Sequence, residues 1–408
     1  MKQLLPGLAL LSLLGWLSFN SESAAPSGSP PAAAKTFRTL LAVSLRPEQE
    51  QEEGERERET ARRRSLPPPT PLSPGRAGAG VERGAGPGSL PLSPGELVEQ
   101  GVFWSRRADR SPPAGFSELH VKRWQHRARS SRLLRLERGC GRPSNRLATF
   151  MDGSRACVRY GINPDQVLGE SLSFYLSRLL GIRNVPALAL SRVNANGDQW
   201  LRVRHEVQAA PWADRPVVSL SEWLGNLSEV VSPASLRPGS RSLHPLARDL
   251  ANVTEREARE LAQWSDLILF DYLTANFDRL ASNLLSLQWD SRVMERSTNN
   301  LHRTPRGALV FIDNEAGLVH GYRVLPMWER YHESLLKTLC IFRRDTARRL
   351  AELHRSRDAA GQLLALYMAS EPLAPQLGFL SQEHAQMLQA RTDRLHKHIL
   401  QCKAKYGK

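Results

Sequence analysis

The long stretch from residue 21 to residue 95 most limits what this chain can fold into. It consists mainly of Pro, Gly, Ser, Ala, Arg and Glu. Such a composition cannot bury enough apolar surface to offset the chain entropy that folding would cost. We therefore expect a disordered stem at 21–95. Residues 96–408 remain, which is enough chain for one two-lobed domain with a full core.

An almost unbroken apolar run, residues 4–19, precedes the stem. It is shorter than the roughly 20 residues that span a typical bilayer. It fits either the apolar core of a signal peptide or a short signal-anchor in a thin early-pathway membrane. With Lys2 on the cytoplasmic side, an uncleaved run would give a type II protein whose C-terminus is luminal. Residues 1–20 are thus expected to be a signal peptide or a membrane anchor.

The formal net charge is +15. A basic surface can attract nucleic acid, anionic glycans, acidic substrates or nucleotide phosphates, and it can also be merely a solvated face. The sequence contains no Lys-rich tail, no nucleic-acid module and no basic motif interleaved with aromatic residues. We therefore expect no nucleic-acid partner.

Two sequons and an even set of cysteines agree with a luminal or extracellular location. The sequons place candidate glycosylation sites at Asn226 and Asn252, although such tripeptides also occur by chance. Four cysteines allow three disulfide pairings. We favour Cys140 with Cys157, across a hairpin, and Cys340 with Cys402, between C-terminal helices. Cysteine pairs or helical His motifs with zinc-ligand spacing do not occur, so a zinc site has little support.

The first half of the domain reads as strands around a helix. Residues 146–150 and 155–160 alternate like strands, and the Asp-Gly between them is a strong hairpin signal. The Gly-rich turn at 139–141, just before them, is a flexible entry where backbone could approach a phosphate. A helix is predicted from Pro164, with Asn163 as its N-cap and Gly181 as its stop. Strand-like runs follow at 186–193 and 199–207. Kinase N-lobes have this order, as do many other α+β domains.

The segment with the clearest chemical content begins with an apolar helix that ends in a polar loop. This loop holds Asp278 and Arg279, and Asn283 follows five residues after Asp278. Strand-like residues occur at 284–287. A buried strand, 308–312, then leads into Asp313, Asn314 and Glu315. Residues from about 325 onward have helical spacing and look structural.

Phosphoryl transfer would explain this set of side chains. One carboxylate accepts a hydrogen bond from the attacking hydroxyl, and a second carboxylate and an amide oxygen hold the divalent metals. The spacing from Asp278 to Asn283 is that of the protein-kinase catalytic loop. Asp278 would then be the base, Asn283 and Asp313 metal ligands, and Glu315 an additional candidate ligand. The alternative is purely structural: Asp278 and Arg279 would form a local ion pair, Asn283 would be a turn residue, and 313–315 would be a solvated turn after the strand.

Residues 270–279, together with Asp313-Asn314-Glu315, resemble the four-jointed family of Golgi kinases. These are relatives of the secretory-pathway kinases that phosphorylate casein-type substrates. The similarity extends over nearly all of the expected domain and includes 101–104, 156–161 and 402–407.

The resemblance implies an atypical protein-kinase-like fold of the α+β class. It would have a β-rich N-lobe at about 96–222 and an α-helical C-lobe at about 223–408. ATP with Mn²⁺ or Mg²⁺ would be the donor. The acceptors would be Ser and Thr in extracellular cadherin domains of the Fat and Dachsous type, in planar cell polarity signalling. The protein would be a type II Golgi membrane protein, a secreted one, or both.

One position departs from the general kinase pattern. Where an ATP-contacting lysine is expected in the hairpin, the sequence has Arg159. Arginine stays charged and can contact phosphate with two parallel hydrogen bonds, so we expect Arg159 to substitute and to pair with Glu170. Because arginine and lysine are not interchangeable, a secreted binding protein on a kinase-like scaffold, with little or no catalysis, stays open as an alternative. A Golgi glycosyltransferase fits only the type II layout, since an Asp-x-Asp motif is lacking.

Overall fold

The computed structural model describes residues 93–110, 115–161, 163–214, 216–237 and 242–407. The expected leader at 1–20 and nearly all of the expected stem lie outside these ranges. Within them, no helix combines the length and the apolar character needed to cross a bilayer. The described residues belong to one compact unit.

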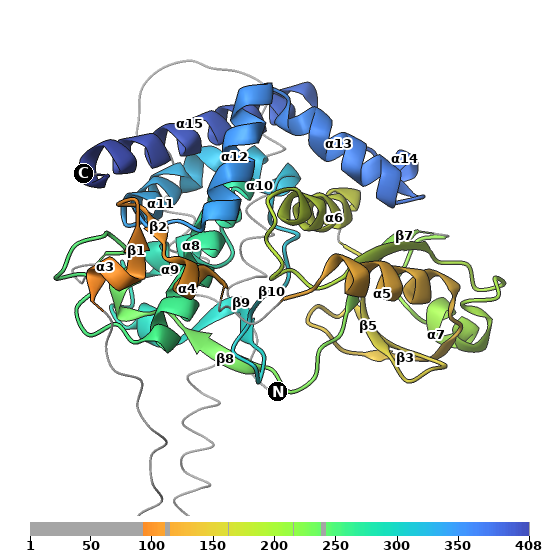
Figure 1. Cartoon of the computed structure of the whole chain (residues 1–408). Helices are drawn as coiled ribbons and strands as arrows, with labels where there is room; N and C mark the ends of the chain where they lie inside the picture. The colour runs from red at the N-terminus through yellow and green to blue at the C-terminus, as the bar shows by residue number, and fades with distance from the viewer. Residues whose placement is uncertain (1–92, 111–114, 162, 215, 238–241, 408) are drawn as a thin grey trace, which may run out of the picture. The chain divides into compact units, whose positions relative to one another are not determined.

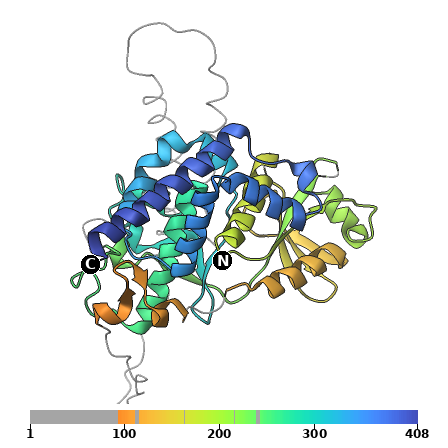
Figure 2. The same ribbon diagram turned by 45° about the horizontal axis from the view of Figure 1, so that its top comes forward.

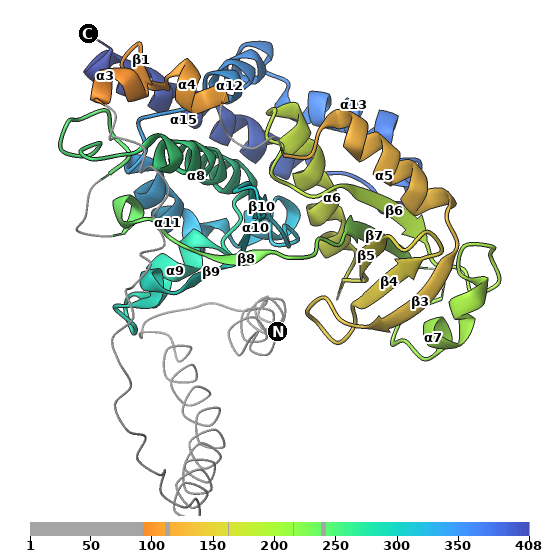
Figure 3. The same ribbon diagram turned by 60° about the horizontal axis from the view of Figure 1, so that its bottom comes forward.

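A five-stranded antiparallel sheet forms the first half of this unit (Figures 1 and 3). The strand order is β3-β4-β5-β7-β6. Its bounds are β3 Leu133–Arg138, β4 Arg146–Phe150, β5 Arg155–Arg159, β6 Leu188–Arg192 and β7 Val217–Glu222. Helix α5 (Glu118–Ser130) packs against β6, and helix α6 (Pro164–Leu179) packs against β6 and β7. The predicted hairpin is β4–β5, and Gly153 in its turn has φ +81°.

Helix α6 has the bounds that the sequence predicted, and Gly181 follows it with φ +75°. Asn163 occupies the N-cap position, as predicted, with extended backbone, but its side chain makes no capping hydrogen bond. The strand expected at 199–207 is wrong. The segment forms a 3₁₀ turn, η2 (Leu201–Val203), and helix α7 (Arg204–Gln208). Trp200, Val203 and Val207 face the core at helical spacing, and the fifth strand comes later, at β7.

The second half is mainly helical. Helix α8 (Glu255–Thr274) starts with a capping box between Thr254 and Glu257 and is almost fully buried in its last turns. Helix α9 (Leu280–Ser286) replaces the strand expected at 284–287. Leu280, Leu284 and Leu287 lie three and four residues apart and pack on the core, which is helix spacing. A three-stranded sheet, β10-β9-β8, contains β8 Ser228–Val231, β9 Ser297–Arg303 and β10 Leu309–Phe311, the predicted buried strand.

The C-terminal region is helical, as its spacing predicted. Its elements are α10 Val319–Arg323, α11 Leu325–Lys337, α12 Arg344–Ser356, α13 Ala359–Ser370, α14 Ala374–Leu377 and α15 Gln382–Tyr406. Helix α15 packs along α12 and α13, and α13 packs against α6 of the first half (Figure 2). The short elements are α3 Pro94–Leu97, β1 Val98–Glu99, β2 Phe103–Trp104, α4 Arg106–Arg110, η3 Ala234–Leu236 and η4 Val293–Glu295.

Both favoured disulfides are formed. Cys140 joins Cys157, which ties the loop before β4 to strand β5. Cys340 joins Cys402, which ties the segment between α11 and α12 to helix α15. The two sequon residues, Asn226 and Asn252, are exposed and lie in loops with positive φ.

Candidate active site

The polar loop after α8 is fixed by a buried arginine. Helix α8 ends at Thr274, and the next residue, Ala275, has φ +52° and turns the chain sharply. Arg279 follows and has no exposed surface. Its guanidinium donates to both carboxylate oxygens of Asp271 on α8, to the Ile312 carbonyl at 3.0 Å and to Oδ1 of Asn314 at 2.8 Å. Arg279 therefore joins the Asp278 loop to the segment that follows β10.

Asp278 is buried at the centre of this arrangement, with 5% of its surface exposed. Its backbone N–H donates to Oδ1 of Asn276. Asn300, on β9, donates from its side-chain amide to the Asp278 carbonyl at 3.2 Å and to Oδ2 at 3.0 Å. Burial and the negative charge of Asp313 raise the pKa of Asp278 to about 7. A carboxylate with that pKa, held by hydrogen bonds, is suited to accept a proton from a hydroxyl.

The Asp313–Glu315 segment leaves β10 in a sharp turn, with φ +55° at Asp313. Asn314 is buried, accepts from Arg279 and donates to the Phe311 carbonyl at 3.0 Å. Asn314 is therefore part of a buried polar network. Asp313 Oδ1 lies 2.7 Å from Nη1 of Arg159.

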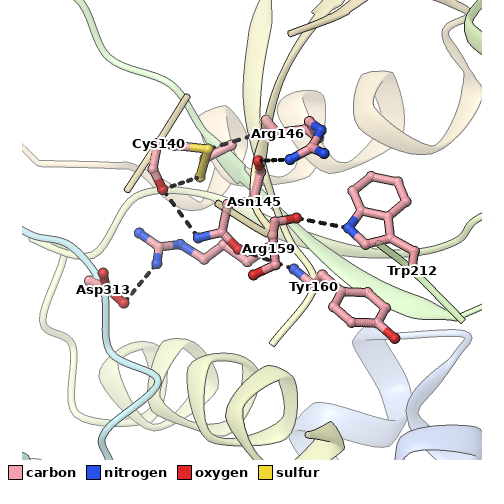
Figure 4. Close-up of a disulfide and its surroundings, with 9 residues drawn as sticks. Cys140, Asn145, Arg146, Arg159, Tyr160, Trp212 and Asp313 are labelled. Carbon is pink, nitrogen blue, oxygen red and sulfur yellow. Dashed lines mark hydrogen bonds and ion pairs between the residues drawn. A yellow bond between two sulfur atoms is a disulfide. The ribbon is translucent and has the colours of Figure 1, made fainter. Parts of the chain in front are cut away.

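The expected ion pair between Arg159 and Glu170 is not formed, because Arg159 binds Asp313 instead (Figure 4). Glu170 lies nearby on α6 and accepts a backbone hydrogen bond from Asn314. Its Oε2 atom makes no hydrogen bond within the described part of the chain. Burial raises the pKa of Glu170 to about 7; the charge of Arg159 lowers it and that of Asp313 raises it.

Asn283 lies on α9, one turn after Arg279, and is buried. Its Nδ2 atom has no hydrogen-bond partner in the described residues. Glu315 is buried too, and forms an ion pair with Arg142.

Arg142 and Asn300 are the site residues that the sequence did not reveal. Arg142 comes from the loop between β3 and β4, and its guanidinium binds Glu315 and Oε1 of Gln166. The only available signal was its place directly after the Gly-rich turn at 139–141. Asn300 carries no motif, and its contact with Asp278 appears only once β9 has its place in the fold.

We call Glu170, Asp278, Asp313 and Glu315 the acidic site. Three guanidiniums of the described residues lie near these carboxylates: Arg142 and Arg159 form ion pairs with Glu315 and Asp313, and Arg279 acts on Asp278 and Glu170 but is paired with a fifth carboxylate, Asp271. Negative charge is therefore in excess. After burial, the charge of Asp313 is what raises the pKa of both Asp278 and Glu170. Carboxylate and amide oxygens are the ligands that Mg²⁺ and Mn²⁺ prefer, and a divalent cation would offset this excess. The residues present therefore fit a divalent metal.

The comparisons with known proteins agree with this architecture. The family model described as "Four-jointed box protein middle domain" matches residues 119–405. "Four-jointed box protein 1" of Homo sapiens is 60% identical over 316 residues, which cover 76% of this chain and 72% of the human protein. The Xiphophorus maculatus protein of the same name is 58% identical, over 78% of this chain and 74% of its own length.

Two more distant proteins extend the comparison. The "Extracellular serine/threonine protein kinase four-jointed" of Drosophila melanogaster is 34% identical over 359 residues, covering 75% of this chain and 61% of that protein. The crystal structure of the Golgi casein kinase superposes with a TM-score of 0.50 at 14% identity, covering 74% of this chain and 82% of that one. This likeness shows a kinase-like α+β fold, as the sequence predicted. The chain belongs to the four-jointed family.

Proposed function

We propose that this protein is a secretory-pathway Ser/Thr protein kinase that transfers phosphate from metal-ATP to extracellular domains. One observation carries the proposal: Arg279 joins the Asp278 loop to the Asp313 segment through buried hydrogen bonds. That link holds a base candidate and a metal-ligand candidate in one rigid arrangement, which phosphoryl transfer requires. The kinase name of the Drosophila relative supports the same activity.

Each residue then has a role. Asp278 accepts the hydrogen bond of the attacking hydroxyl, and Asn300 orients its carboxylate. Asn283 and Asp313 would hold Mn²⁺ or Mg²⁺, which neutralises charge on the triphosphate. Arg159 contacts phosphate, and the Glu170 carboxylate acts on it only through its charge, from α6. Glu315 is engaged by Arg142, so we place it next to the metal site rather than among its first ligands.

The substrates proposed are Ser and Thr in cadherin domains of the Fat and Dachsous type, in planar cell polarity signalling. The location proposed is the Golgi membrane, the extracellular space, or both, with residues 1–20 as anchor or signal peptide. The resemblance described above supports these points, and the two exposed sequon residues agree with a luminal domain.

The test uses the full chain produced in a secretory host. Purified protein is incubated with labelled ATP, Mn²⁺ and cadherin repeats, beside Asp313→Ala and Asp278→Asn. We expect the wild type to transfer phosphate, and Asp278→Asn to lose about 10²- to 10⁴-fold in rate. Both variants must show the wild-type melting temperature for the comparison to count. A folded, glycosylated wild type without transfer would refute the kinase proposal.

The ion pair between Arg159 and Asp313 favours a second candidate, a secreted binding protein on a kinase scaffold. In that case Arg159 would neutralise the carboxylate that a kinase uses for metal. The signalling potency of the purified protein on cells decides between the two. Unchanged potency of a folded Asp313→Ala variant would support the binding protein, and loss of potency would exclude it.

A further inference from the structure

We propose that Arg142 is a second phosphate-binding cation of the acidic site, which exchanges its partner Glu315 for the phosphates of the nucleotide. This inference rests on the proposed kinase function and names a residue that determines nucleotide affinity.

The position of Arg142 is the first argument. Its side chain reaches from the β3–β4 loop to α6, where it donates to Gln166 at 3.0 Å, and to Glu315 after β10. Burial lowers the pKa of its guanidinium, the carboxylates of Asp313, Asp278 and Glu170 raise it, and Arg159 lowers it. Arg142 therefore lies near all four carboxylates of the acidic site.

Accessibility separates Arg142 from the other arginines of the site. Arg279 is fully buried and its donors are used by Asp271, Ile312 and Asn314. The Arg159 side chain is 9% exposed, whereas that of Arg142 is 21% exposed. Of the three, Arg142 is thus the guanidinium that solvent and a solute reach most easily. Its fork can keep Gln166 while it binds two oxygens of a phosphate.

The loop that carries Arg142 is held in place (Figure 4). Cys140 and Gly141 have φ of +52° and +90° and turn the chain tightly. The disulfide fastens Cys140 to Cys157, two residues before Arg159 on β5. Asn145 donates to the Cys140 carbonyl at 3.1 Å and accepts from the Tyr160 backbone at 3.4 Å. Both guanidiniums therefore extend from one cross-linked piece of backbone, which lowers the entropy lost when they bind one ligand together.

The binding step is an exchange of hydrogen bonds, without any covalent change. Phosphate oxygens replace the Glu315 carboxylate as acceptors for Arg142. Glu315 competes with the nucleotide for the same donors, so its removal should strengthen nucleotide binding, whereas removal of Arg142 should weaken it. If the ion pair were purely structural, removal of Glu315 would weaken nucleotide binding, as removal of Arg142 does, because each change would leave a buried charge without its partner.

The experiment measures the affinity of the full chain for Mn-ADP by titration calorimetry. The variants are Arg142→Gln, Glu315→Gln and Arg138→Gln, the last an exposed arginine on β3 that removes the same charge as a control. We expect Arg142→Gln to weaken binding about 10- to 100-fold, the usual loss for a charged hydrogen-bond donor. Glu315→Gln should bind more tightly than the wild type, and Arg138→Gln should bind like it.

Two results would overturn the inference: unchanged affinity in Arg142→Gln, or equal weakening in Arg142→Gln and Glu315→Gln. A wild type that binds no nucleotide would instead refute the proposed kinase function. If Arg142→Gln melts early, Arg142→Lys replaces it, since lysine keeps the charge and lacks the fork. Arg142→Lys should raise the KM for ATP and leave the KM for the acceptor protein unchanged.

Discussion

Arg279 is an arginine without exposed surface, and its charge is balanced by Asp271 alone among its hydrogen-bond partners. We predict that Asp271→Asn lowers the free energy of unfolding by about 3–5 kcal/mol, because it leaves a buried charge without its counter-ion. Urea unfolding with the disulfides intact measures this loss. Asp290→Asn is the control: it removes a partly exposed pair with Arg296, and the change should stay below about 1 kcal/mol.

The raised pKa of Asp278 predicts the pH dependence of transfer. A base works only when it is deprotonated, so kcat/KM should rise with pH and level off above about 7, the pKa of Asp278. The hydrogen bond from Asn300 lowers this pKa, so Asn300→Gly should move the rise to higher pH. Glycine is chosen because Asn300 has φ +56°. A rise at the same pH in both proteins would contradict the assignment of Asp278 as the base.

At the scale of elements, helix α6 lies unusually close to the turn after β10. A Cβ atom on Gly169 would come within 2.8 Å of the Gly317 carbonyl oxygen and 3.0 Å of that of Glu315. We predict that Gly169→Ala lowers stability by about 1–3 kcal/mol, the usual cost of overpacking, and displaces Glu170. Thermal unfolding checks the first effect and phosphate transfer the second. Gly225→Ala is the matched control, since nothing lies within 4 Å of its added Cβ, and it should melt like the wild type.

The two disulfides should have different effects. Their loops span 17 and 62 residues, so chain-entropy arguments predict losses of about 3 and about 4 kcal/mol on removal. Only Cys140–Cys157 holds the loop of Arg142, so replacing that pair by serine should also weaken nucleotide binding. Replacing Cys340 and Cys402 should lower the melting temperature and leave nucleotide affinity unchanged. If the two double variants had equal affinity for nucleotide, the Cys140–Cys157 disulfide would have no special role in nucleotide binding.

The sequence predicted the elements whose structure depends on residues close together in the chain. The Asp-Gly turn indicated the β4–β5 hairpin, and the apolar run 308–312 indicated β10. The runs at 199–207 and 284–287 misled because short apolar segments fit helix and strand spacing equally well. Asn300 and Arg142 could not be predicted, because each reaches its partner only through the tertiary fold. Asn300 lies 22 residues from Asp278 in the sequence, and Arg142 lies 173 residues from Glu315. The sequence predicted Glu170 as the ion-pair partner of Arg159, whereas the structure pairs Arg159 with Asp313.

At the scale of the whole molecule, the C-terminal helices hold the helices of the first half in place (Figure 2). Glu371, just after α13, is buried and accepts from Arg129 of α5 at 2.9 Å and from the Tyr175 hydroxyl of α6 at 3.1 Å. We predict that Glu371→Gln lowers stability by about 1–3 kcal/mol. Hydrogen exchange should become faster in α5, α6 and α13 together. Faster exchange in α13 alone would show that α6 does not depend on this contact.

The beginning and the end of the described chain meet. A Cβ atom on Gly101 would lie 2.2 Å from the Tyr406 carbonyl oxygen, and Trp104 donates its backbone N–H to Phe342. During synthesis, Gly101 leaves the ribosome roughly 300 residues before Tyr406, a delay on the order of 15–60 s at usual translation rates. Until Tyr406 is synthesised, the segment around Gly101 therefore lacks its final packing partner. A premature stop codon shortly before Tyr406 would leave Gly101 without this neighbour permanently, even though the contact of Trp104 with Phe342 could still form.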